Sequence, residues 1–140
     1  MIQKLIDAIS VTLNSEFGDE YEIYQESIEQ GLKRPCFSIV CVLPTNERYF
    51  ANRYRRTNKF CIHYFPPKGN EKADCYEKLE RLWQLFEFID FDGSKIKGSE
   101  MNGEFEDGIL HFFVNFDFYV DKVLEKPKME TVEQSSKVKG

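Results

Sequence analysis

The chain lacks the features on which most enzymes and membrane proteins depend. No apolar run reaches the roughly 18 residues that a membrane-spanning helix requires. There is no Gly-x-x-x-x-Gly-Lys, Gly-x-Gly-x-x-Gly or Gly-x-Ser-x-Gly motif for phosphates, dinucleotides or a nucleophile. The four cysteines include no Cys-x-x-Cys pair. These absences predict a protein that is not an enzyme, binds no cofactor and keeps free thiols in a reducing cytoplasm.

One pair of residues has a spacing that metal sites use. Cys61 and His63 are two positions apart on a predicted strand, so both side chains lie on one face. No second pair has a comparable spacing, and His111 is a lone histidine on another predicted strand. A lone strand histidine is usually a structural or solvated residue. The sequence therefore predicts no metal site and no catalytic residues.

A strong alternation of apolar residues runs through residues 109–120. All the even positions are apolar, which places six side chains on one face of a β-strand. These positions are Leu110, Phe112, Val114, Phe116, Phe118 and Val120. A strand this apolar needs a helix layer or another sheet against that face.

The remaining pattern predicts an α+β fold: a mostly antiparallel sheet of about five strands with two helices packed on one face. The first helix runs from Ile2 to near Phe17, and the second from Asn70 to near Asp92–Gly93, with Leu82 and Trp83 facing the sheet. The strands are expected at 21–27, 36–43, 48–65, 94–104 and 109–120, with turns at Pro44–Asn46 and Asp107–Gly108. In the third strand, Phe50, Tyr54, Phe60, Ile62 and Tyr64 are expected to face the core. Residues 1–122 are expected to form one domain, and residues 123–140 a mobile polar tail.

Charge is distributed unevenly along a chain whose net charge is -5. Residues 16–29 carry acids and no base, whereas residues 33–68 carry eight bases and the single acid Glu47. Either the two segments pair within one sheet, or they form separate patches that contact other molecules, including copies of this chain. The candidate interface residues are Arg48, Arg53, Arg55, Arg56 and Lys59 on the basic side and Glu20, Glu22 and Glu26 on the acidic side.

The run Arg53-Tyr54-Arg55-Arg56 permits three interpretations. Arginine is a frequent interface cation because its planar fork binds carboxylates. Bases interleaved with aromatic rings also suit nucleic acid. The third interpretation is a solvated strand face.

Several segments together resemble a known family. They are Arg34-Pro35-Cys36-Phe37 at the start of an apolar strand, Asn52 to Arg56, the run Phe60 to Pro66, and Leu82-Trp83 on the second helix. Over residues 1–122 the chain resembles the tail-terminator, or tail-completion, proteins of long-tailed phages and phage-tail-like particles of Gram-positive bacteria.

The resemblance implies a structural protein that forms a ring, typically a hexamer, at the head-proximal end of the tail tube. Such a ring stops tail growth and offers a surface for head joining. It implies contacts with other copies, the tail tube protein, a sheath protein and head–tail connector proteins, with no membrane and no nucleic acid except DNA passing through the ring. The protein would act in the host bacterial cytoplasm and then in the virion. The alternatives are a basic-stripe nucleic-acid-binding module and a small cytoplasmic chaperone or adaptor.

Overall fold

The computed structural model describes residues 1–27 and 31–122 of the chain. Its helices are α1 (Ile2–Phe17) and α2 (Glu71–Leu85), and its strands are β1 (Glu22–Tyr24), β2 (Cys36–Phe50), β3 (Arg53–Phe65), β4 (Phe88–Phe91), β5 (Ser94–Glu106), β6 (Ile109–Phe116) and β7 (Phe118–Asp121). The α+β class is confirmed. The predicted mobile tail, 123–140, lies outside the described residues. In the part described, neither helix is long and apolar enough to cross a membrane.

The strands form one curled sheet in the order β1-β2-β3-β6-β5-β4, with β7 paired to β3 beyond the end of β6. The pair β1–β2 is parallel and the other pairs are antiparallel, so the sheet is mixed. The prediction of about five antiparallel strands was therefore imprecise. It missed β4, and it joined β6 and β7 into one strand.

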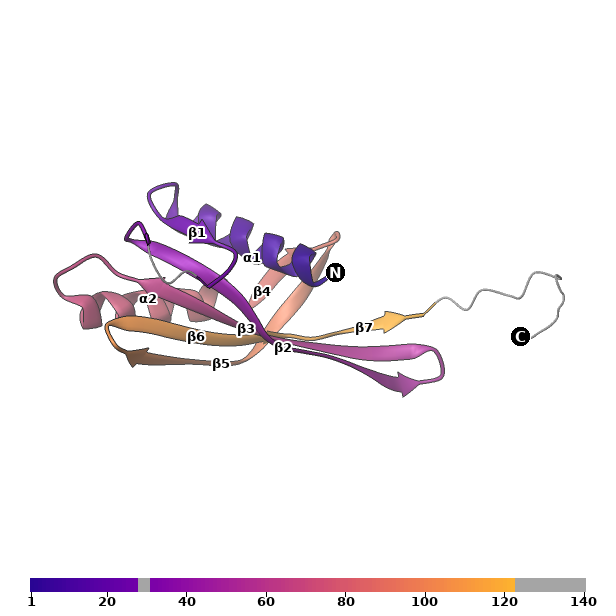
Figure 1. The fold of residues 1–140 in the computed structure, drawn as a ribbon. Helices are drawn as coiled ribbons and strands as arrows, with labels where there is room; N and C mark the ends of the chain where they lie inside the picture. The colour runs from indigo at the N-terminus through magenta and orange to yellow at the C-terminus, as the bar shows by residue number, and fades with distance from the viewer. Residues whose placement is uncertain (28–30, 123–140) are drawn as a thin grey trace, which may run out of the picture.

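The core lies between the sheet and both helices, as Figure 1 shows. Strand alternation places the even residues of β3 and β6 on this face, and Phe60, Ile62, Phe112 and Val114 are fully buried there. The helices cover them with Leu5, Ile9 and Leu13 from α1 and with Cys75 and Leu82 from α2. Each buried large apolar side chain contributes about 1.5–3 kcal/mol.

A polar cluster ties α2 to β3 inside this core. The Tyr64 hydroxyl donates to Asp74 Oδ2 at 2.6 Å, and the buried Lys78 ammonium donates to Asp74 Oδ1 and Glu77 Oε1, each at 2.9 Å. Burial raises the pKa of Tyr64, and its hydrogen bond to Asp74 raises that pKa further. The cluster keeps a buried lysine paired, which a buried charge requires.

The predicted turn at Pro44–Asn46 is wrong, because β2 continues through it to Phe50. Beyond Ser38, β2 is an edge strand since β1 covers only residues 36–38, and an edge strand tolerates a proline. A β-bulge between Cys41 and Leu43 interrupts the β2–β3 register. Phe50 was predicted to face the core, but it lies at the far end of this extension and is 74% exposed.

The second helix is shorter than predicted. It ends at Leu85, and the apolar residue Ile89 belongs to β4 instead. Asp92 and Gly93 form the β4–β5 hairpin turn, with φ values of 51° and 78°. Trp83 was predicted to be a core residue and is 43% exposed, whereas its neighbour Leu82 is fully buried, as predicted.

The fold predicts different costs for two neighbouring truncations on α2. Leu82→Ala removes a fully buried side chain and is expected to lower the free energy of unfolding by about 2–5 kcal/mol. Trp83→Ala is the matched control, with an expected loss within about 1 kcal/mol because its ring lies partly in solvent. Chemical denaturation measures both. A loss under about 0.5 kcal/mol for Leu82→Ala, or a loss for Trp83→Ala that exceeds the loss for Leu82→Ala, would contradict the orientation of α2 against the sheet.

Candidate assembly surface

Strands β2 and β3 extend well past the body of the protein. We call residues 43–59 together with β7 the arm; in Figure 1 the arm projects beyond both helices, away from the region of β1. Within it, β2 and β3 remain paired from Leu43↔Lys59 to Phe50↔Arg53, and β7 lies along the other edge of β3. The arm is therefore a three-stranded ribbon, and the start of α1 reaches it at Met1 and Ile2, which line a small pocket with Pro44 and Phe118.

One backbone hydrogen bond and two side-chain hydrogen bonds fix the tip of the arm. Ala51 takes the left-handed conformation at the turn, and Arg48 Nε donates to the Ala51 carbonyl at 2.8 Å. The Lys122 amide donates to the Asn52 carbonyl at 2.7 Å, and Asn52 Nδ2 donates to the Lys122 carbonyl at 2.8 Å. These reciprocal bonds hold the end of β7 against the turn between β2 and β3.

The predicted basic residues fall on both faces of the arm. Arg53, Arg55 and Lys59 share the face opposite the core, in register with Asp121, Tyr119 and Asn115. Arg48 and Arg56 lie on the other face, because Arg48 is opposite Tyr54, one strand repeat from Arg56. The residues predicted from sequence thus lie on one element but not on one surface.

Two of these arginines already have carboxylate partners. Arg53 Nε lies 3.1 Å from Asp121 Oδ1, and Arg55 Nη2 lies 3.3 Å from Asp117 Oδ2. Asp117 also accepts a hydrogen bond from the Asn58 amide at 3.2 Å. A phosphate group would have to compete with these carboxylates, which weakens the interpretation of the strand as a nucleic-acid stripe.

The acid partners could not be identified from local sequence. They lie more than sixty positions away from the arginines and come into range only through the β3–β7 register. No local signal marked Asp117, because the apolar alternation of the even positions continues through Phe116, Phe118 and Val120 although β6 ends and β7 begins there.

Aromatic side chains cover the outer part of the arm. Tyr49 is 63% exposed and Phe50 is 74% exposed, and the Tyr49 ring lies 5.0 Å from the Tyr119 ring. The Arg53 guanidinium lies over the Tyr119 ring at 5.5 Å. We call Tyr49, Phe50 and Tyr119 the aromatic tip. Exposed aromatic groups on a projecting ribbon are typical of a contact surface.

The acidic segment pairs with the start of the basic one, because β1 lies beside residues 36–38 of β2 in the same sheet. The predicted pairing of the two segments within one sheet is therefore confirmed, but it stops short of the arm and leaves the arginines of the arm out. Glu20, Glu22 and Glu26 are exposed around this short edge strand. Within residues 1–27 and 31–122, no ion pair involves any of these three acids.

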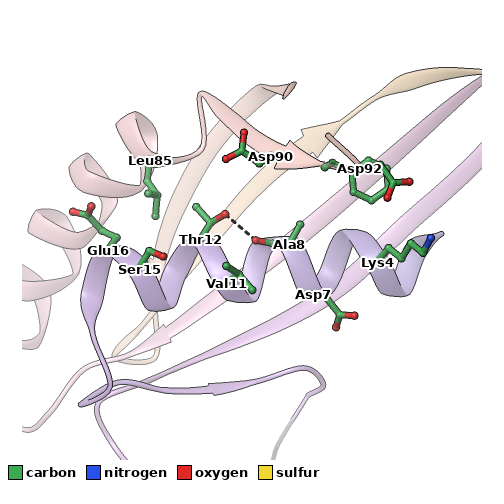
Figure 2. A pocket seen from close by; sticks show the side chains of 11 residues that line it. Lys4, Asp7, Ala8, Val11, Thr12, Ser15, Glu16, Leu85, Asp90 and Asp92 are labelled. Carbon is green, nitrogen blue, oxygen red and sulfur yellow. Dashed lines mark hydrogen bonds between the residues drawn. The ribbon is translucent and has the colours of Figure 1, made fainter. Parts of the chain in front are cut away.

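An open groove lies between α1 and β4, with a volume of about 550 Å³ (Figure 2). Its polar side chains sit along the rim: Asp7 and Glu16 on α1 and Asp90 and Asp92 on the β4 side. The Thr12 hydroxyl donates to the Ala8 carbonyl of its own helix at 2.8 Å. The residues described as lining the groove include no histidine or cysteine.

The structure adds a third member to the Cys61–His63 pair. His111 on β6 lies directly opposite His63, on the face away from the helices. The sequence search missed this neighbour because it considered spacing along one strand and not the register between two strands.

A family model described as phage tail terminator protein matches residues 4–128. No curated protein matches the chain. Among the solved structures that match, one is 10% identical with a TM-score of 0.39, and the alignment covers 86% of this chain and 97% of that one. At that TM-score the likeness carries no argument about fold or function.

The two ion pairs of the arm are expected to contribute differently to the free energy of unfolding. Asp117→Ala removes a mostly buried carboxylate that holds both Arg55 and the Asn58 amide, and should lower the free energy of unfolding by about 1–3 kcal/mol. Asp121→Ala breaks an exposed pair and should cost about 0–1 kcal/mol. Urea denaturation of both variants shows whether Asp117→Ala lowers the free energy of unfolding more than Asp121→Ala does. Equal losses would contradict the anchoring role of Asp117.

Proposed function

Because the chain belongs to the phage tail terminator family, we propose that its copies form a closed ring on the head-proximal end of the tail tube. The ring stops tube growth and presents a surface to the head. The observation that carries this proposal is the arm, which exposes aromatic and basic side chains far from the core. A phage tail component acts within the virion.

A ring of identical subunits needs two different patches that meet head to tail. The arm and the acidic region around β1 lie at opposite ends of the subunit in Figure 1. Their charges are complementary: within the described residues, Arg48 and Arg56 have no carboxylate partner, and Glu20 and Glu22 have no basic partner. Contact between the arm of one copy and the acidic end of the next would pair these arginines with these glutamates.

The two kinds of side chain contribute differently to such a contact. Buried aromatic anchors supply most of the affinity at protein interfaces. Rim charges mainly set orientation and association rate, and an exposed pair is worth about 0–1 kcal/mol. In this proposal the aromatic tip supplies the affinity, and the arginines set the register between neighbours.

The same ring accounts for the other proposed partners. One of its flat sides stacks on the tail tube protein, with a sheath protein around it where the tail contracts, and the other side receives head–tail connector proteins. A hexamer is proposed because the family's rings are typically hexameric. DNA passes through the ring without sequence-specific contact, and assembly takes place in the host cytoplasm before the virion is complete.

The two alternatives have less support. A nucleic-acid-binding module needs a continuous stripe of free bases on one face, whereas Arg53 and Arg55 are paired with aspartates and Arg48 and Arg56 lie on the opposite face. A chaperone or adaptor that holds a partner peptide needs a dedicated cleft, and the groove beside α1 is open along its length with charged side chains at its rim.

The proposal predicts that the aromatic tip is required for assembly and not for folding. Tyr49→Ser combined with Phe50→Ser should leave the circular dichroism spectrum unchanged and the subunit monomeric, because both side chains are exposed in the subunit. Val11→Ser is the matched control, since Val11 is 66% exposed on α1, away from the arm. Sedimentation velocity and negative-stain images, with and without tail tubes, measure ring formation.

Rings formed by wild type and by Val11→Ser, and lost in the double variant, are the expected result. Rings that persist in the double variant would contradict the role of the arm. A wild-type protein that stays monomeric and binds DNA with strong salt dependence would favour the nucleic-acid module, and a stable dimer would favour the adaptor.

A further inference from the structure

Three side chains that can ligate a metal meet on the sheet face that the helices leave uncovered. They are Cys61 and His63 from β3 and His111 from β6, and their ligand atoms all lie within 4.8 Å of one another. His63 is directly opposite His111, and Cys61 is two residues before His63 on the same face. The strand register therefore brings the three groups together without any loop.

The distances suit a tetrahedral metal ion. Zn–S and Zn–N bonds of about 2.3 and 2.0 Å at a tetrahedral angle place neighbouring ligand atoms about 3.3–3.5 Å apart. Cys61 Sγ and His63 Nε2 are 3.5 Å apart. The His63 and His111 rings meet edge to face, with centroids 4.8 Å apart. Rotation of the half-buried His111 ring closes the remaining gap with the backbone in place.

Without a metal ion, the surroundings keep the Cys61 thiol protonated. Burial, together with the charge of Glu104, raises its pKa to about 11. An activated cysteine has a lowered pKa, so Cys61 lacks that property, and a bound metal ion would have to displace the thiol proton. Burial, with His111 as a second cause, lowers the pKa of His63, so its imidazole is neutral as a metal ligand must be.

We propose that Cys61, His63 and His111 bind one Zn²⁺ ion per chain. One thiolate and two imidazoles form a donor set that suits zinc. On binding, the Cys61 thiol releases its proton to solvent, both imidazoles bind in the neutral form, and no group changes oxidation state. The fourth position opens toward solvent on the side of β5, where Glu104 lies directly opposite His111. The ion links the central strands β3 and β6, and this role is independent of ring formation.

Cobalt is the probe, because Co²⁺ occupies zinc sites and its bond to a thiolate absorbs in the near ultraviolet. Titration of the full-length protein with Co²⁺ should give a charge-transfer band that saturates at one equivalent and disappears when Zn²⁺ is added. His111→Asn should weaken Co²⁺ binding by more than about tenfold, since even outer-shell changes cost that much. Cys61→Ser should abolish the band. Cys41→Ser, a half-buried thiol outside the cluster, is the matched control and should keep it.

A second readout needs no variant, because the chain contains two histidines and both lie in this cluster. One equivalent of Zn²⁺ should shift the ring nitrogen resonances of both histidines in a ¹⁵N spectrum. Shifts at one or neither histidine, no cobalt band at tenfold excess, a band that survives Cys61→Ser, or a band lost in Cys41→Ser would each overturn the proposal.

Discussion

The pairing of β3 along its whole length is the constraint on which the rest of the structure depends. The C-terminal half of the strand buries Phe60, Ile62 and Tyr64 beneath the two helices, and its N-terminal half continues into the arm without a break. A shift of one residue turns the side chains of a strand to the other face, and both register shifts between β2 and β3 insert their extra residue in β2. Strand β3 itself keeps one alternation along its pairing with β6 and β7. The core therefore fixes which arm residues point to which side, and it places Cys61 and His63 together on the uncovered face.

The neighbours of β3 divide the molecule into a body and a projection. Strand β6 ends at Phe116, and β7 then continues along the same edge of β3. Between them, Asp117 accepts hydrogen bonds from the Arg55 side chain and the Asn58 amide. The arm thus gains a third strand while exposing Tyr49 and Phe50. An ordered projection loses little conformational entropy on contact with a partner, which favours assembly. In the ring proposed above, this projection is the element that contacts the neighbouring subunit.

Features that repeat with a short period were predictable from the sequence, whereas features that depend on long-range register were not. The alternation from Leu110 to Phe116 and the Asp107–Gly108 turn were read correctly. Trp83 was misplaced because helical spacing could not tell which edge of α2 meets the sheet. The partners of Arg53 and Arg55, and the meeting of His63 with His111, follow from pairing between distant strands, which no local pattern encodes.

The most direct test of the proposed contact between neighbouring subunits is a charge exchange across it, measured by sedimentation. Arg48→Glu with Arg56→Glu should leave the subunit folded and abolish rings, because no ion pair described within the subunit uses either arginine. Adding Glu20→Arg and Glu22→Arg should restore rings in part, and Lys95→Glu with Lys97→Glu on β5 serves as the reversal control that leaves them intact. Rings that persist in the arginine variant, or that the second exchange does not restore, would contradict a contact between the arm and the acidic end.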